Sequence, residues 1–295
     1  MSSVTNMVGV ADDAERFFAL DLPPIFVVGA ARSGTTWVYD VLAAHPHVAG
    51  VLESFLFTTG RGIGGLLNLL DRPGTPDGMR RIMPTDDLAG ELRWFAAGLL
   101  GRSVEPGRRV VVEKSGVHAQ YMHGIWRLFP DARFVHVLRD GRDVVVSALA
   151  AQRSWAPTWP RSTVRAARQW VTNAQAATHG RAARPDQFLE IRYEDLHADP
   201  VAGYRVLYDF CGLQYDEDLL AEVVDRNDFS RQYAGGEDRF RRGARVGDWR
   251  TRFSRADVAQ FFVAAGRSLV RLGYEPDHRW VIRTLALGRA SDGRR

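Results

Sequence analysis

Pro24–Trp37 reads PIFVVGAARSGTTW. Its first part, Pro24–Gly29, is a short apolar run of the kind that forms a strand buried on both faces of a parallel sheet. From Thr35 the apolar residues follow helical spacing, and this pattern stops before Pro46. A strand, a loop of small residues and a helix therefore follow one another, which is the setting of a phosphate-binding loop.

The rest of the chain alternates between strand-like runs and amphipathic helical patterns. This alternation predicts an α/β fold, a P-loop-containing three-layer sandwich with a mostly parallel five-stranded sheet and helices on both faces. Ligands of such sheets bind at the carboxyl ends of the strands. The further strands are expected at residues 47–52, 109–113, 133–138 and 188–193. Helices are expected at residues 35–42, 66–70, 88–100, 121–129, 140–151, 163–178, 201–211, 216–224 and 255–272.

The length of 295 residues suits a single domain over residues 1–295. Residues 55–108 hold Gly/Pro-rich stretches and two helical patterns, and we expect them to form a variable cap. The Arg-rich residues 288–295 look like a disordered tail. The single cysteine, Cys211, cannot form an internal disulfide, and neither a signal peptide nor a membrane-spanning apolar run is visible. A cytoplasmic protein is therefore expected.

The charge balance favours an anionic ligand. The formal net charge is +4, and Lys114 is the only lysine in a chain rich in arginine. A lone lysine beside a predicted strand is a candidate functional residue. No motif of interleaved aromatic and basic residues supports nucleic-acid binding, so no nucleic-acid partner is expected.

The loop after Gly29 differs from that of nucleoside triphosphatases in one position. The pattern G-x-x-x-x-G-K-[ST] requires a lysine that reaches the β- and γ-phosphates, and Thr35 stands in its place. A P-loop kinase or hydrolase remains an alternative, but the missing lysine disfavours it.

The segment RSGTTW, Arg32–Trp37, resembles the 5′-phosphosulfate loop of bacterial members of the sulfotransferase family that uses 3′-phosphoadenosine-5′-phosphosulfate (PAPS). The resemblance implies PAPS as donor, adenosine 3′,5′-bisphosphate (PAP) as product, and no metal. Arg32 would steady the charge on the oxygen that bridges phosphorus and sulfur. The remaining loop residues would cradle the 5′-phosphate or, in the case of the tryptophan, pack against the adenine: Ser33, Gly34, Thr35, Thr36 and Trp37.

A second segment, Val137–Ser147, reads VLRDGRDVVVS and resembles the 3′-phosphate-binding segment of the same family. There an arginine and a serine eight residues later grip the 3′-phosphate, and Arg139 and Ser147 hold these positions. A guanidinium group suits this role because it forms charge-assisted, often bidentate bonds to phosphate.

A third segment, Phe240–Trp249, reads FRRGARVGDW and resembles the late loop that wraps the 3′-phosphate and adenosine. The three segments occur in family order from residue 24 to residue 249. The residues implied for cofactor binding here are Arg241, Arg242 and Gly243, with Tyr193 and Phe229 at adenine-contacting positions.

The resemblance implies sulfuryl transfer to a hydroxyl by in-line displacement, which needs cations near the transferring group and a base for the acceptor's proton. Lys114 resembles the family lysine that contacts the sulfuryl oxygens. Two residues remain candidates for the base, Glu53 after the second predicted strand and His118 after the third.

The acceptor is expected to be a small or medium-sized hydroxyl compound: a secondary metabolite, glycan, lipid, phenol or peptide tyrosine. The stretches 55–108 and 152–161 are expected to lie on the acceptor side. The oligomeric state stays open. A non-catalytic protein that binds adenosine bisphosphate is a further alternative, disfavoured because Arg32, Lys114 and Glu53 occur together.

Overall fold

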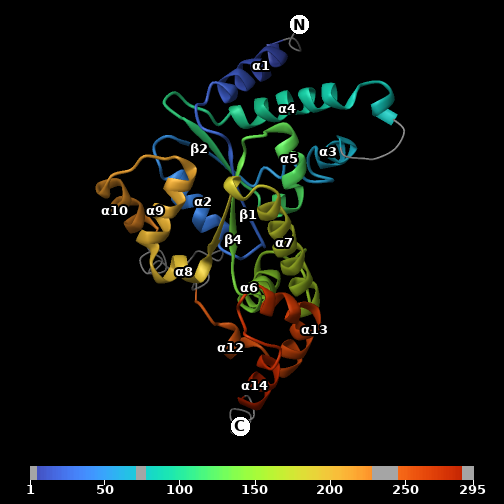
Figure 1. Cartoon of the computed structure of the whole chain (residues 1–295), viewed down its shortest axis with the longest axis vertical. Coiled ribbons are helices and arrows are strands. Elements are labelled where there is room, and N and C mark those ends of the chain that lie inside the picture. Colours follow the sequence, from blue (N-terminus) through green and yellow to red (C-terminus); the bar gives the residue numbers. More distant parts are fainter. Residues whose placement is uncertain (1–4, 71–77, 228–244, 288–295) are drawn as a thin grey trace.

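The computed structural model describes residues 5–70, 78–227 and 245–287. Its centre is a five-stranded sheet in the order β2-β3-β1-β4-β5, in which every neighbouring pair is parallel (Figure 1). The predicted α/β fold is confirmed. The strands are β1 (Ile25–Gly29), β2 (Val48–Leu52), β3 (Val110–Lys114), β4 (Arg133–Leu138) and β5 (Phe188–Arg192).

Successive strand residues point to opposite faces, so each apolar strand feeds two cores. Phe26 and Val28 join one core, and Ile25 and Val27 join the other. The first core is covered by α1 (Thr5–Phe18), α3 (Gly64–Leu70), α4 (Thr85–Gly101) and α5 (Met122–Leu128). The second is covered by α2 (Thr35–Ala43), α8 (Tyr193–Ala198), α9 (Pro200–Cys211) and α10 (Glu217–Arg226).

A third apolar cluster lies beyond these two layers. Trp170, Phe261 and Trp280 are among its buried side chains. Figure 1 shows α1 and α4 side by side at one end of the molecule and α6, α12 and α14 toward the other. The helices of this second end are α6 (Gly141–Ser154), α7 (Thr163–Ala183), α12 (Trp249–Arg252), α13 (Arg255–Arg271) and α14 (Trp280–Leu287).

The structure differs from the expected boundaries in ways that concern the site. β3 runs one residue further than expected, so Lys114 is its last residue and pairs in register with Leu52 of β2. β5 ends at Arg192, and Tyr193 begins α8 instead of closing the strand. A 3₁₀ stretch, Gly116–Tyr121, precedes α5.

Helices α1 and α14 were not expected, and the physical reason is the same for both. Each packs apolar side chains against another helix, α1 against α4 and α14 against α13. Most helical stability in proteins comes from such packing and not from propensity, so these segments carry a weak local signal. Within the part of the chain that the structure describes, no helix is long and apolar enough to cross a bilayer.

Candidate functional site

Each strand of the sheet leads into one of the predicted site residues. Because all strands are parallel, their carboxyl ends meet at one edge of the sheet, where α/β proteins bind their ligands. In the order of the sheet, the residues at this edge are Glu53, Lys114, Arg32, Arg139 and Tyr193.

The loop between β1 and α2 has the backbone of an anion-binding turn. Arg32 and Gly34 adopt positive φ angles of 73° and 102°. A Cβ atom on Gly34 would lie 2.6 Å from the Tyr193 ring, so only glycine fits there. Gly34 caps α2 without a side-chain hydrogen bond, which leaves the first N–H groups of the helix available.

The hydroxyl-bearing side chains of this loop and of the helix turn after it differ in exposure. Ser33 Oγ is buried and has no hydrogen-bond partner among the described residues. Thr35 is buried in the first turn of α2, and Thr36 is exposed. A buried hydroxyl without a partner, next to free helix N–H groups, fits a bound phosphate because each needs an acceptor.

Arg32 joins the first predicted motif to the second. Its Nε donates a hydrogen bond to Ser147 Oγ over 3.0 Å, and its carbonyl accepts one from Arg139 over 3.1 Å. Its guanidinium also faces the Trp155 ring, with 5.6 Å from Cζ to the ring centroid. Two segments more than 100 residues apart therefore form one cationic cluster.

The Arg139 guanidinium is held in place by its contacts, and its Nε–H has no partner among the described residues. Its guanidinium lies over the Tyr193 ring at 4.1 Å and donates to the carbonyl of Arg245 over 3.0 Å. Arg139 Nε is buried and has no partner within the described segments. A fixed cation with an unused donor fits a second phosphate group.

Trp37, predicted to pack against adenine, is mostly covered by protein. It is 6% exposed, its indole N–H donates to Tyr204 Oη over 2.9 Å, and its ring meets the edge of Tyr193. In this arrangement Trp37 supports Tyr193, which in turn supports Arg139.

The late predicted segment is described only from Arg245 onward. Phe229, Arg241, Arg242 and Gly243 lie outside the described residues.

Asp143 fastens the described part of this segment to α6. Its carboxylate accepts hydrogen bonds from the N–H groups of Gly247 and Trp249 over 2.7 and 2.9 Å. Burial raises the pKa of Asp143, against the smaller lowering effect of these two bonds. This role was not predicted, although the second acid in RDGRD was a visible signal.

Glu53 and Lys114 form an ion pair at the edge between β2 and β3. Lys114 Nζ donates to Glu53 Oε1 over 2.7 Å, and the Glu53 N–H donates to the Lys114 carbonyl over 2.7 Å. The Lys114 side chain is 3% exposed and that of Glu53 is 55% exposed. A fixed inner cation thus lies beside a carboxylate that solvent and ligands can reach.

Glu113, which was not among the predicted site residues, organises the loop that carries Glu53. One carboxylate oxygen accepts from Ser54 Oγ and Ser115 Oγ over 2.7 and 2.6 Å, and the other accepts from His118 Nδ1 over 2.9 Å. The Phe57 N–H donates to His118 Nε2 over 3.3 Å. A lone acid in the valine-rich β3 was the signal for this network.

This network also determines what His118 can do. Its side chain is wholly buried, and both ring nitrogens are engaged. His118 therefore holds the loop after Glu53 from the inside and presents no ring nitrogen to an acceptor in this conformation.

Solved structures share this fold. Retinol dehydratase in complex with retinol and PAP is 18% identical with a TM-score of 0.52, and the match covers 88% of this chain and 85% of that one. A mouse sulfotransferase complexed with PAP is 16% identical with a TM-score of 0.53, and the match covers 86% and 89% of the two chains.

Curated relatives match over shorter stretches. Omega-hydroxy-beta-dihydromenaquinone-9 sulfotransferase of Mycobacterium bovis is 29% identical over 114 residues, 36% of this chain and 29% of that protein. Protein-tyrosine sulfotransferase of Drosophila melanogaster is 24% identical over 220 residues, 72% of this chain and 42% of that protein. The matched part thus spans less than half the length of either relative.

The family model described as "Sulfotransferase family" matches residues 23–217, which is most of the chain and includes β1 to β5. The match contains the loop after β1, the Glu53–Lys114 pair and the Arg139 segment. The chain is therefore a member of the sulfotransferase family.

Proposed function

We propose that this protein transfers a sulfuryl group from PAPS to a hydroxyl of a small or medium-sized acceptor by in-line displacement. Family membership supports the reaction class. The observation that carries the proposal is the ion pair between Lys114 Nζ and Glu53 Oε1, at 2.7 Å, on the sheet edge that also holds the Arg32 loop. It supplies a cation and a base at one place.

The donor's two phosphate groups would be held at two places on this edge. Ser33, Gly34 and the first N–H groups of α2, at Thr35 and Thr36, suit the 5′-phosphate, because their donors lack side-chain partners among the described residues. Arg139 and Ser147 suit the 3′-phosphate. The PAP complexes of the structural neighbours support this choice of ligand.

Bound PAPS supplies a sulfur that the acceptor oxygen attacks while the bond from sulfur to the 5′-phosphate oxygen breaks. Arg32 would stabilise the negative charge that develops on the departing phosphate. Lys114 would stabilise the sulfuryl oxygens. Glu53 would take the proton of the acceptor hydroxyl, a role that its exposure allows and that the burial of His118 does not.

The alternatives have less support. A P-loop kinase or hydrolase needs a lysine where Thr35 stands. A non-catalytic PAP-binding protein would not need the Glu53–Lys114 pair, because neither a proton acceptor nor a cation at the sulfuryl group is required for binding alone. The names of the relatives indicate a terminal hydroxyl of a menaquinone derivative and a protein tyrosine as acceptors of those proteins. A lipid-like alcohol and a phenol are therefore the first acceptors to try.

The test is transfer of radiolabelled sulfate from PAPS to a panel of phenols, alcohols and sugars. The wild-type protein is expected to label at least one class of acceptor. Lys114→Met is expected to lose this labelling and to keep the wild-type affinity for PAP. Arg271→Met, which removes an exposed cation at the far end of α13, is the matched control. Equal labelling by the wild type and Lys114→Met would contradict the proposal.

A further inference from the structure

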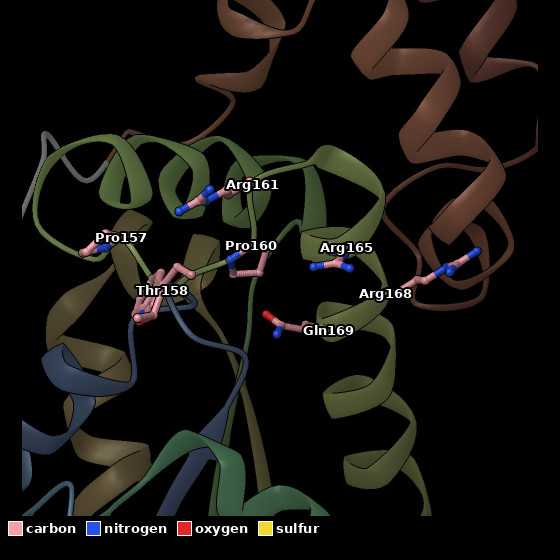
Figure 2. A pocket seen from close by; sticks show the side chains of 8 residues that line it. Pro157, Thr158, Pro160, Arg161, Arg165, Arg168 and Gln169 are labelled. Atoms are coloured by element: carbon pink, nitrogen blue, oxygen red, sulfur yellow. The ribbon is translucent and has the colours of Figure 1, made fainter.

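A pocket of about 400 Å³ opens between the end of α6 and the first turns of α7 (Figure 2). Trp159, Pro160, Arg161, Arg165 and Gln169 contribute to its lining. It belongs to none of the phosphate-holding loops described above. Its wall includes part of the stretch 152–161, which the sequence analysis expected on the acceptor side.

The pocket is strongly cationic. Arg161, Arg165 and Arg168 all line it, all are exposed, and none forms an ion pair within the described residues. Asp257 lies at the same end of α7, but its carboxylate accepts a hydrogen bond from Thr163 and does not pair with these arginines. Guanidinium groups gathered in a concave surface attract anions, and each offers donors suited to carboxylate, sulfate or phosphate oxygens.

Two of the polar side chains converge on the hollow. Figure 2 shows Arg165 and Gln169 reaching from α7 toward Pro160, whereas Arg168 points to the opposite side in this view. Arg161 lies on the segment that enters α7, and its guanidinium points away from Arg165 and Gln169 in this view. Arg161, Arg165 and Gln169 all line the same pocket, so these three are the candidate binding groups.

A pair of tryptophans connects this pocket to the reaction site. The rings of Trp159 and Trp155 are 5.2 Å apart and meet edge to face, and Trp155 lies under the guanidinium of Arg32 at 5.6 Å. Arg32 is the residue that would stabilise the departing phosphate. A molecule that reaches the site along this aromatic wall would therefore place its other end near Arg161 and Arg165.

We propose that this pocket binds an anionic group of the acceptor, so that the acceptor is an acidic hydroxy compound whose carboxylate, sulfate or phosphate lies apart from the hydroxyl that reacts. This inference rests on the proposed function, because it assigns an acceptor to that site. Arg161 and Arg165 bind the anion through charge-assisted hydrogen bonds, and Gln169 donates through its amide. The two tryptophans pack against the apolar part between anion and hydroxyl.

The test compares hydroxy acids with their own methyl esters, which keep the hydroxyl and lose the charge. Suitable pairs are para-hydroxyphenylacetate, omega-hydroxydodecanoate and galacturonate, each with its ester. Binding is measured by calorimetry on protein with and without saturating PAP. At least one acid is expected to bind about tenfold or more tightly than its ester, the usual worth of a charged hydrogen bond.

The double variant Arg161→Gln/Arg165→Gln should lose this preference and keep the wild-type affinity for PAP. Arg271→Gln, which removes one exposed arginine at the end of α13 and outside the pocket, should keep both. Three results would overturn the inference: no acid preferred over its ester, a preference that survives the double variant, or a loss of PAP affinity in the double variant, which would assign the pocket to the donor. Failure of PAP binding in the wild type would refute the proposed function separately.

Discussion

Lys114 Nζ lies 2.7 Å from Glu53 Oε1, although 61 positions separate the two residues in the chain. The contact exists because β3 is the neighbour of β2 and pairs Lys114 with Leu52, the residue before Glu53. The lysine is buried and the glutamate is exposed, so the fixed ammonium group of Lys114 holds the accessible carboxylate of Glu53 in position.

Glu53→Gln should reduce turnover by about 10²–10⁴-fold, the usual contribution of a positioned proton acceptor. The amide keeps the shape of the side chain and removes the base, so the affinity for PAP should not change. Steady-state turnover with labelled PAPS and calorimetry with PAP measure the two effects. Near-normal turnover of Glu53→Gln, together with an inactive His118→Ala that still binds PAP, would transfer the role to His118.

PAP should raise the melting temperature without any metal, because a ligand that binds only the folded state stabilises it. At a concentration of 100 times Kd the gain is about 2.7 kcal/mol. ATP with Mg²⁺ should give a much smaller shift, because Thr35 stands in the place of the lysine that binds β- and γ-phosphates. Thermal denaturation with each nucleotide, with and without EDTA, measures this. A larger, Mg²⁺-dependent shift with ATP would favour a kinase or hydrolase.

Ser147→Ala and Arg139→Ala should weaken the binding of PAP far more than the binding of adenosine 5′-monophosphate, which has no 3′-phosphate. The loss for the arginine should be about 10–100-fold, since a charged hydrogen bond contributes roughly 1.5–3 kcal/mol. Both residues also contact Arg32, Arg139 at its carbonyl and Ser147 at its Nε, so the affinity for adenosine 5′-monophosphate is the control for a displaced Arg32. Equal losses for the two nucleotides would place both residues away from the 3′-phosphate.

Glu113→Gln should destabilise the protein by about 1–3 kcal/mol, because an amide cannot accept from Ser54, Ser115 and His118 at once and leaves a buried donor unpaired. Amide hydrogen exchange should accelerate at Phe57, whose N–H is held by His118. Glu222→Gln, which alters an exposed pair with Arg226, is the control and should change little. Unchanged exchange at Phe57 would mean that Glu113 does not order this loop.

The stability of the protein should depend on pH through Asp143. Its pKa is raised above the ordinary 3.8 mainly by burial, so the folded state binds the proton more tightly than the unfolded state. The contribution of this residue to stability is therefore largest below its ordinary pKa and falls as pH rises through the raised value. The stability of the wild type minus that of Asp143→Asn, from urea titrations, should decline over this range. A difference that grows with pH would show that the N–H donors of Gly247 and Trp249 outweigh burial.

The class of fold followed from the sequence because strands buried on both faces are continuous apolar runs, and five of them alternate with helices. The residues that we propose for donor binding were predictable for a related reason. Arg32–Thr36 are consecutive residues that lead from the loop after β1 into α2, and Arg139 and Ser147 lie on one short segment, so a local pattern identifies each set. The helices α1 and α14 were not predictable in this way, because packing on a partner helix stabilises them.

By itself, the sequence determined the phosphate loop with threonine in place of lysine, the parallel sheet and the set of charged residues at strand ends, because residue type and spacing encode local structure directly. The tertiary structure alone decided which of these residues meet. It buried His118 against Glu113 and left Glu53 exposed, it linked Arg32 to Ser147 across 115 positions, and it placed Trp155 and Trp159 between Arg32 and the Arg161–Arg165 pocket. These contacts depend on strand order and helix packing, which bring together segments whose separation in the chain carries no signal of their proximity.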